Sequence, residues 1–73
     1  MAELTTKQYD ALERAIIEGF RIAVRRSGNR EVVCLPSALR LVGGRELIVA
    51  THPTTGDRLE LFIDEIEALE VVR

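Results

Sequence analysis

The first third of the chain carries apolar residues at the spacing of a helix. Thr5 and Gln8 have the spacing of a capping box, in which each side chain bonds the backbone N–H of the other residue. Gly19 is placed to end the helix, because glycine readily adopts the left-handed conformation found there. The pattern predicts an amphipathic helix over residues 6–18. The apolar residues at helical spacing are Tyr9, Leu12, Ile16 and, just beyond the end of the helix, Phe20.

From Phe20 onward the apolar residues alternate with polar ones, which is typical of strands. Pro36 lacks a backbone N–H, so the chain should bend there or lie at a sheet edge. Glycine-rich hairpin or loop signals fall at 27–30, 43–44 and 53–57, and a helical turn is expected at 64–66. The pattern predicts five or six short strands, with approximate ranges 20–25, 31–35, 39–41, 46–52, 58–63 and 69–72.

Short strands separated by frequent turns favour a small closed barrel, because closure removes unpaired edges. The expected fold is therefore α+β and mostly β: an N-terminal amphipathic helix, then a five- or six-stranded antiparallel small barrel over residues 20–72. Apolar residues fall on both faces of the later strands. The helix should cover one of those faces. Otherwise a second subunit would cover it, with Ile48 and Phe62 as the interaction surface.

The size and composition of the chain indicate one small domain over residues 1–73. The hydrophobic share is 47%, but Trp is absent and the chain has only one Tyr and two Phe. Leu, Ile, Val and Ala must therefore build the core. A domain of this size buries only about 60% of its unfolded surface, so a homo-oligomer would add stability.

The charge is unevenly distributed along the chain. The formal net charge is −2, yet residues 21–45 hold six Arg and one Glu, which gives a local charge of +5. Arginine forks suit phosphate and carboxylate groups, so nucleic acid or another anionic ligand is a candidate partner. The alternative is that these arginines are ordinary solvated charges on the strands, where they keep sheet edges from pairing. The lack of aromatic stacking partners favours this alternative. The candidate anion-binding residues are Arg21, Arg25, Arg40 and Arg45.

Catalysis has little support in the sequence. Cys34 and His52 could form a thiolate and base, but no third orienting group is readable around them. Cys34 is better interpreted as a small buried hydrophobe. One Cys and one His also fall short of a structural zinc site, and the acidic residues after position 63 lack a calcium-loop pattern. We therefore expect no enzyme activity, metal or cofactor.

The expected location is the cytoplasm. A lone Cys34 cannot form an intramolecular disulfide, which suits a reducing compartment. The N-terminus does not show the basic region followed by an apolar stretch that is typical of a signal peptide. No segment approaches the roughly 18 consecutive apolar residues that a membrane span needs.

The order of several features resembles the WYL domain. A helix ending in Glu18-Gly19-Phe20-Arg21 leads into a strand, Pro36 follows, and Gly43-Gly44-Arg45 precedes an apolar strand. The likeness extends through Leu61-Phe62-Ile63-Asp64-Glu65-Ile66 and covers nearly the whole chain. The Trp-Tyr-Leu run that names the family would fall on residues 46–48, where Glu46-Leu47-Ile48 keeps only apolar character at the last two positions.

The resemblance implies an SH3- or Sm-like five-stranded barrel that acts as a ligand-sensing or nucleic-acid-contacting module in bacterial transcription regulation. Asp64 and Ile66 match the family's Asp-Arg-Ile pattern, but Glu65 replaces the arginine used in ligand recognition. Two functional hypotheses follow. The first is a non-catalytic WYL-type binding module with an anionic ligand, and the second is a protein–protein or self-assembly module.

Overall fold

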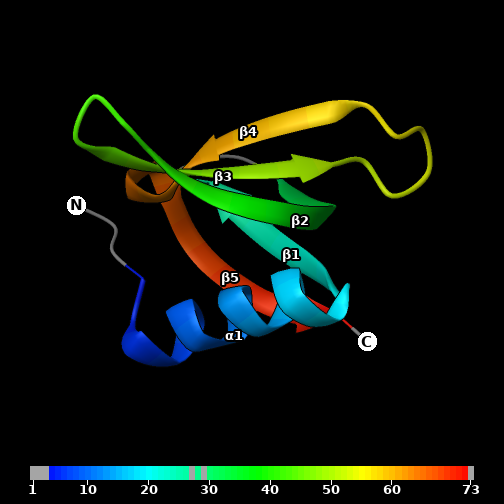
Figure 1. The fold of residues 1–73 in the computed structure, drawn as a ribbon, viewed down its shortest axis with the longest axis horizontal. Coiled ribbons are helices and arrows are strands. Elements are labelled where there is room, and N and C mark those ends of the chain that lie inside the picture. The colour runs from blue at the N-terminus through cyan, green and yellow to red at the C-terminus, as the bar shows by residue number, and fades with distance from the viewer. Residues whose placement is uncertain (1–3, 27, 29, 73) are drawn as a thin grey trace.

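The computed structural model describes residues 4–26, 28 and 30–72 of the chain. Within them a helix is followed by a strongly twisted antiparallel sheet (Figure 1). The elements are the helix α1 (Thr6–Glu18), the strands β1 (Arg21–Arg26), β2 (Glu31–Val42), β3 (Arg45–Thr51) and β4 (Arg58–Phe62), a short 3-10 helix η1 (Ile63–Glu65), and the strand β5 (Ile66–Val72).

The helix has the bounds predicted from its capping signals. The backbone N–H of Gln8 donates to Thr5 Oγ1 at 3.2 Å, and the backbone N–H of Thr5 donates to Gln8 Oε1 at 2.9 Å. Gly19 has φ 78° and ends the helix in the left-handed conformation. The predicted helix over residues 6–18 is confirmed because both of its ends are set by local side-chain and backbone preferences.

The five strands form one antiparallel sheet in the order β4-β3-β2-β1-β5. The prediction of a mostly β domain with a preceding helix is therefore confirmed. β2 and β3 are joined through Gly43 and Gly44, whose φ values of 58° and 79° fit the two-residue hairpin predicted there. The predicted turn at 27–30 lies partly outside the described residues, although its strands pair as expected, with Arg25 opposite Glu31.

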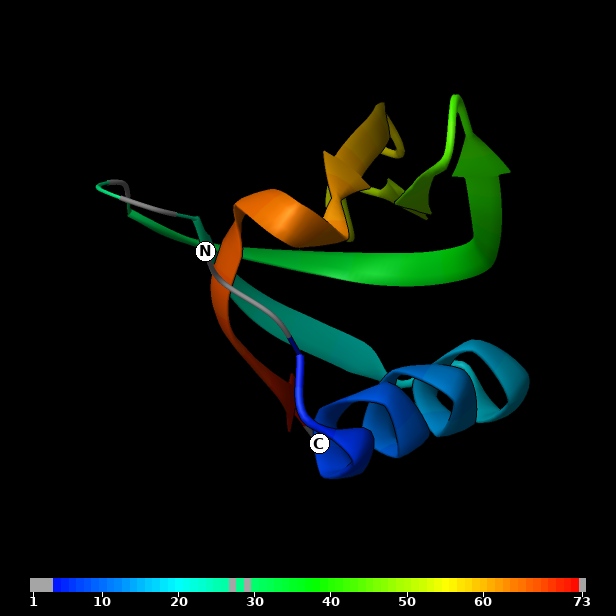
Figure 2. The same ribbon diagram turned by 90° about the vertical axis from the view of Figure 1, so that its left-hand side faces the viewer.

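The main difference from the predicted strand pattern is at Pro36. Two strands were expected there, but the structure has the single strand β2, whose pairing register with β3 shifts between Pro36 and Ala38. This bulge accommodates the missing N–H of Pro36, and Ser37 Oγ donates to the Val49 carbonyl at 3.1 Å beside it. Figure 2 shows β2 turning sharply near its end. The first half of β2 pairs with β1 and the second half with β3, so the bend divides the sheet into two half-sheets.

The helix is part of the hydrophobic core. It packs against β1, β2 and β5, and its Leu12 and Ala15 are fully buried. The Tyr9 hydroxyl also donates to Glu46 Oε1 at 2.6 Å, which ties the helix to the start of β3. The other large, fully buried side chains of the core are Ile22, Val24, Cys34, Ile48, Leu61 and Ile66.

Candidate functional site

The structure divides the four predicted anion-binding arginines between the two half-sheets. Arg21 and Arg25 lie on the outer face of β1, because Ile22 and Val24 between them point into the core. Arg40 lies opposite Leu47 on the second half-sheet. Arg45 precedes Leu47 by two residues on β3 and is therefore the diagonal cross-strand neighbour of Arg40 on the same face. The fold therefore places two of the arginines on each half-sheet, with the bend of β2 between the two pairs.

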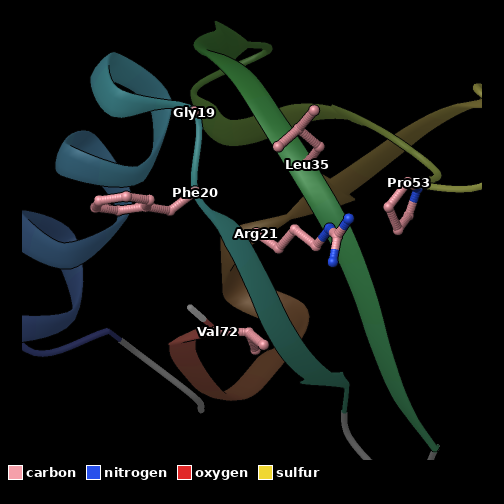
Figure 3. A pocket seen from close by; sticks show the side chains of 6 residues that line it. All are labelled: Gly19, Phe20, Arg21, Leu35, Pro53 and Val72. Carbon is pink, nitrogen blue, oxygen red and sulfur yellow. The ribbon is translucent and has the colours of Figure 1, made fainter.

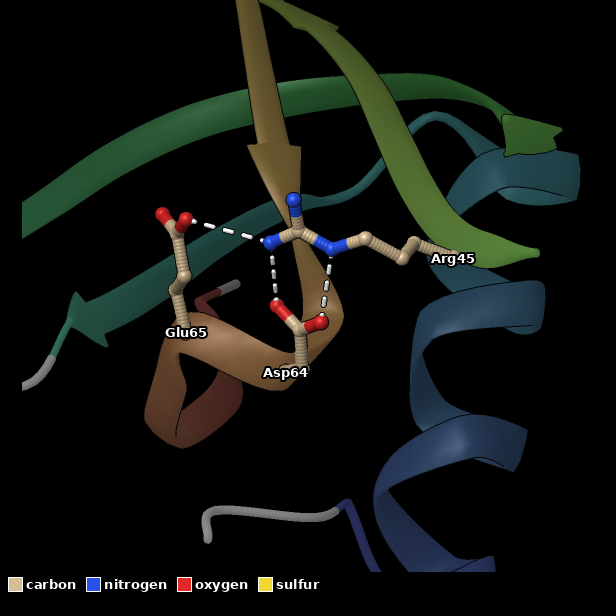
Figure 4. Close-up of polar contacts among 3 residues, drawn as sticks. All are labelled: Arg45, Asp64 and Glu65. Atoms are coloured by element: carbon tan, nitrogen blue, oxygen red, sulfur yellow. Dashed lines mark hydrogen bonds and ion pairs between the residues drawn. The ribbon is translucent and has the colours of Figure 1, made fainter. Parts of the chain in front are cut away.

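Arg45 is held by acidic residues of its own chain. Its guanidinium donates to both carboxylate oxygens of Asp64 at 2.8 Å and to Glu65 Oε2 at 3.3 Å (Figure 4). It also lies over the Phe62 ring, 3.8 Å from the ring centroid. The hydrogen bonds from Arg45 hold the pKa of Asp64 below its usual range. Arg45 thus ties the start of β3 to η1, and an incoming anion would have to displace two carboxylates.

Arg25 is also close to an acid. Its Nε lies 3.9 Å from Glu67 Oε1, and Glu31 is its direct cross-strand neighbour on β2. Both members of the Arg25–Glu67 pair are largely exposed, so the pair contributes little to stability. The nearby negative charge nevertheless makes Arg25 a poor anion site.

Arg21 has a different environment. It lines an open pocket of about 340 Å³ whose other walls are mostly apolar. Among residues 4–26, 28 and 30–72, no side chain forms a hydrogen bond or ion pair with its guanidinium. Figure 3 shows the Arg21 side chain reaching from β1 across β2 toward Pro53. The pocket is lined by Gly19, Phe20, Arg21, Leu35, Pro53 and Val72.

A second pocket of about 560 Å³ adjoins the first along β2 and shares Pro53 with it. The loop that carries Pro53 is shaped by His52, whose Nδ1 accepts hydrogen bonds from the backbone N–H groups of Thr54 and Thr55 at 3.1 and 3.2 Å. Val33 lies in this second pocket and is 37% exposed. The two pockets together form a groove between β2 and the loop from β3 to β4.

The sequence patterns found Arg21 but missed the groove around it. Pro53 was predicted to lie in a turn, and Leu35 and Val72 in strands, with nothing to connect them. They meet because β2 and β5 flank β1 while the β3–β4 loop folds back toward β2. The only sequence signal for this site was the alternation of apolar and polar residues along β1, which placed Arg21 on the outer face.

Ile48 and Phe62 do not form an open interaction surface in this structure. Ile48 is 0% exposed, in register with Leu39 on one side and Leu61 on the other. Phe62 is half-buried and lies beneath the Arg45 guanidinium. The expectation that Ile48 meets another chain is corrected here, because in the twisted sheet its side chain faces the core.

Cys34 lies in the core, as its apolar sequence context suggested. Burial raises the pKa of the thiol from 9.0 to about 11, because the charged thiolate is disfavoured away from water. The thiol is therefore protonated at neutral pH, which is the opposite of what an activated cysteine nucleophile needs.

We expect Cys34 to react slowly with Ellman's reagent while the chain is folded. The raised pKa alone lowers the thiolate fraction about 100-fold at pH 8, and burial blocks access as well. The rate in native buffer should therefore be at least about 100-fold below the rate in guanidinium chloride. Equal rates in the two solutions would contradict the burial of Cys34.

Comparison of the chain with known protein families, with characterised proteins and with solved structures finds no match. Within the described residues, α1 is too short and too polar to cross a membrane. In the same part of the chain, no three His, Cys, Asp or Glu side chains gather in a way that could hold a metal ion.

Proposed function

We propose that this chain is a non-catalytic binding module that takes an anionic group at Arg21. The observation that carries the proposal is an arginine exposed in an apolar pocket and without an acidic partner among the described residues. A guanidinium is always charged and presents its donors in a planar fork, so it suits a carboxylate or phosphate. The neighbouring apolar walls would favour a ligand that joins the anion to an apolar part.

The WYL resemblance is part of the same proposal. A helix before five antiparallel strands, in the order β4-β3-β2-β1-β5 and with η1 between β4 and β5, supports a small barrel of the SH3 or Sm type. A WYL-type module would act in the bacterial cytoplasm, in transcription regulation. Glu65, which replaces the family's ligand-binding arginine, lies in the Arg45 cluster. The proposed site of this chain is therefore at Arg21 instead.

The competing hypothesis, self-assembly through Ile48 and Phe62, has less support. Complete burial removes Ile48 from any surface that a second chain could contact without unfolding the first. Phe62 offers only the part of its ring that Arg45 leaves uncovered.

The proposed site predicts that small anions perturb the residues around Arg21. Hexanoate, inorganic phosphate and a short thymidine oligonucleotide would each be titrated into ¹⁵N-labelled protein at low salt. We expect saturable amide shifts at Gly19, Leu35 and Val72 with at least one of them. Arg21→Gln should weaken that binding about tenfold, because a charge-assisted hydrogen bond is lost.

The matched control is Arg40→Gln, which removes an exposed arginine from the other half-sheet. It should leave the titration curves unchanged. Absence of saturable shifts with all three anions, or equal affinity in the Arg21 variant and the wild type, would overturn the proposal.

A further inference from the structure

We propose that the occupant of the Arg21 site is a short acidic peptide, bound in an extended conformation across both pockets of the groove. An Asp or Glu side chain of the peptide contacts Arg21, and apolar residues two positions to either side enter the two pockets. This inference rests on the proposed function and adds the chemical class of the ligand.

The length of the groove fits an extended peptide. Leu35 lines the first pocket, and the second extends along the same strand, β2, past Val33 to Glu31. Side chains four residues apart in a strand point to the same face and are about 13 Å apart. In an extended peptide, the two residues that lie two positions to either side of a central acid are separated by the same distance, so they can reach both pockets while the peptide runs along β2.

The charges of the groove also suit a peptide with a single central acid. The Arg21 side chain reaches toward Pro53, the residue that both pockets share, so the cation stands near the junction (Figure 3). The second pocket contains both Arg30 and Glu31. Arg30 can donate hydrogen bonds to the C=O groups of a peptide backbone, and Glu31 can accept them from its N–H groups. A polyanion would instead meet repulsion from Glu31.

Single-stranded nucleic acid is the less suitable occupant because the groove has no open stacking platform. The chain has three aromatic residues. Tyr9 bonds Glu46 beside the helix, Phe62 lies under Arg45, and the ring of Phe20 turns from the pocket edge toward α1 (Figure 3). Non-specific binding of single strands relies on aromatic side chains that stack on successive bases, in a groove of uniform positive charge. Apolar walls at Leu35, Val72 and Val33 offer contacts to aliphatic side chains instead.

The test uses a fluorescent, end-blocked heptapeptide of sequence Thr-Leu-Thr-Glu-Thr-Leu-Thr, with binding followed by anisotropy. We expect saturable binding that falls about tenfold when Gln replaces the central Glu, because the charged contact with Arg21 is lost. Ser in place of both Leu should weaken binding by a similar factor, through the loss of apolar contact. Insensitivity to both changes would overturn the inference.

A pocket variant separates the peptide from a simple anion. Val33 is partly exposed, so Val33→Gln should leave the fold intact, and circular dichroism would check this. It should weaken the peptide several-fold and leave hexanoate shifts at Gly19 unchanged. Equal peptide affinity in this variant and the wild type would show that the peptide does not occupy the second pocket, and would overturn the inference.

The outcomes distinguish the ligand class from the site itself. Hexanoate shifts that depend on Arg21, without any peptide binding, would overturn the peptide inference and keep the proposed function. Tighter, Arg21-dependent binding of the thymidine oligonucleotide would identify nucleic acid as the occupant and also overturn the inference. Failure of every probe would overturn both.

Discussion

Ile48→Asp is expected to leave the chain unfolded. The Ile48 side chain is completely buried in the middle of β3, between Leu39 and Leu61 in the ladder. An ionised carboxylate in that position has no partner, and the free-energy cost of its burial exceeds about 4 kcal/mol. Small domains are stable by only about 5–15 kcal/mol, and this chain is near the lower end of the size range. Far-UV circular dichroism should show no cooperative thermal transition.

Leu41→Asp is the matched control for this variant. Leu41 also lies in the second half-sheet but is 72% exposed, so the same change should alter stability by less than about 0.5 kcal/mol. A folded Ile48→Asp protein with an unchanged melting temperature would return Ile48 to the list of candidate interface residues.

Leu12→Ala should be the most damaging single truncation on the helix. Leu12 is fully buried against a sheet that supplies most of the helix's stability, because an isolated helix of 13 residues is marginal in water. Removing a buried leucine side chain costs about 2–5 kcal/mol. For a domain of this size, that corresponds to a fall of about 10–30 °C in the melting temperature, measured by calorimetry.

Ile17→Ala tests whether lost packing, and not changed helix propensity, causes the stability loss expected for Leu12→Ala. Ile17 lies on the same helix but is 82% exposed, so its truncation should change the melting temperature little. If both variants lost equal stability, the burial of Leu12 against the sheet could not be the cause of the loss.

The local parts of the fold were predictable because their causes are local. Thr5, Gln8 and Gly19 set the helix ends through contacts within a few residues, and Gly43 and Gly44 set a two-residue hairpin in the same way. Pro36 was harder to interpret. Proline predicts a break in a strand, but a bulge beside it let β2 continue through the bend and serve two partners.

The candidate site depended on contacts that alternation along a strand does not reveal. Arg45 has the same sequence character as Arg21, yet the return of the chain through η1 places Asp64 and Glu65 against it. Arg21 instead faces Leu35, Val72 and the loop at Pro53. Charge clustering in the sequence therefore identified arginine as the residue type, and only the three-dimensional arrangement placed Arg21 in a mostly apolar pocket.

The position of β1 between β2 and β5 has a consequence for how the chain folds during synthesis. β1 pairs on one side with β2, which follows it directly, but on the other side Ile22 lies opposite Val71. While the ribosome makes the intervening strands, one edge of β1 stays unpaired, and the core lacks Ile66 and Leu69. Folding of the first strand is therefore completed only after the last one has left the ribosome, when this long-range pairing becomes possible.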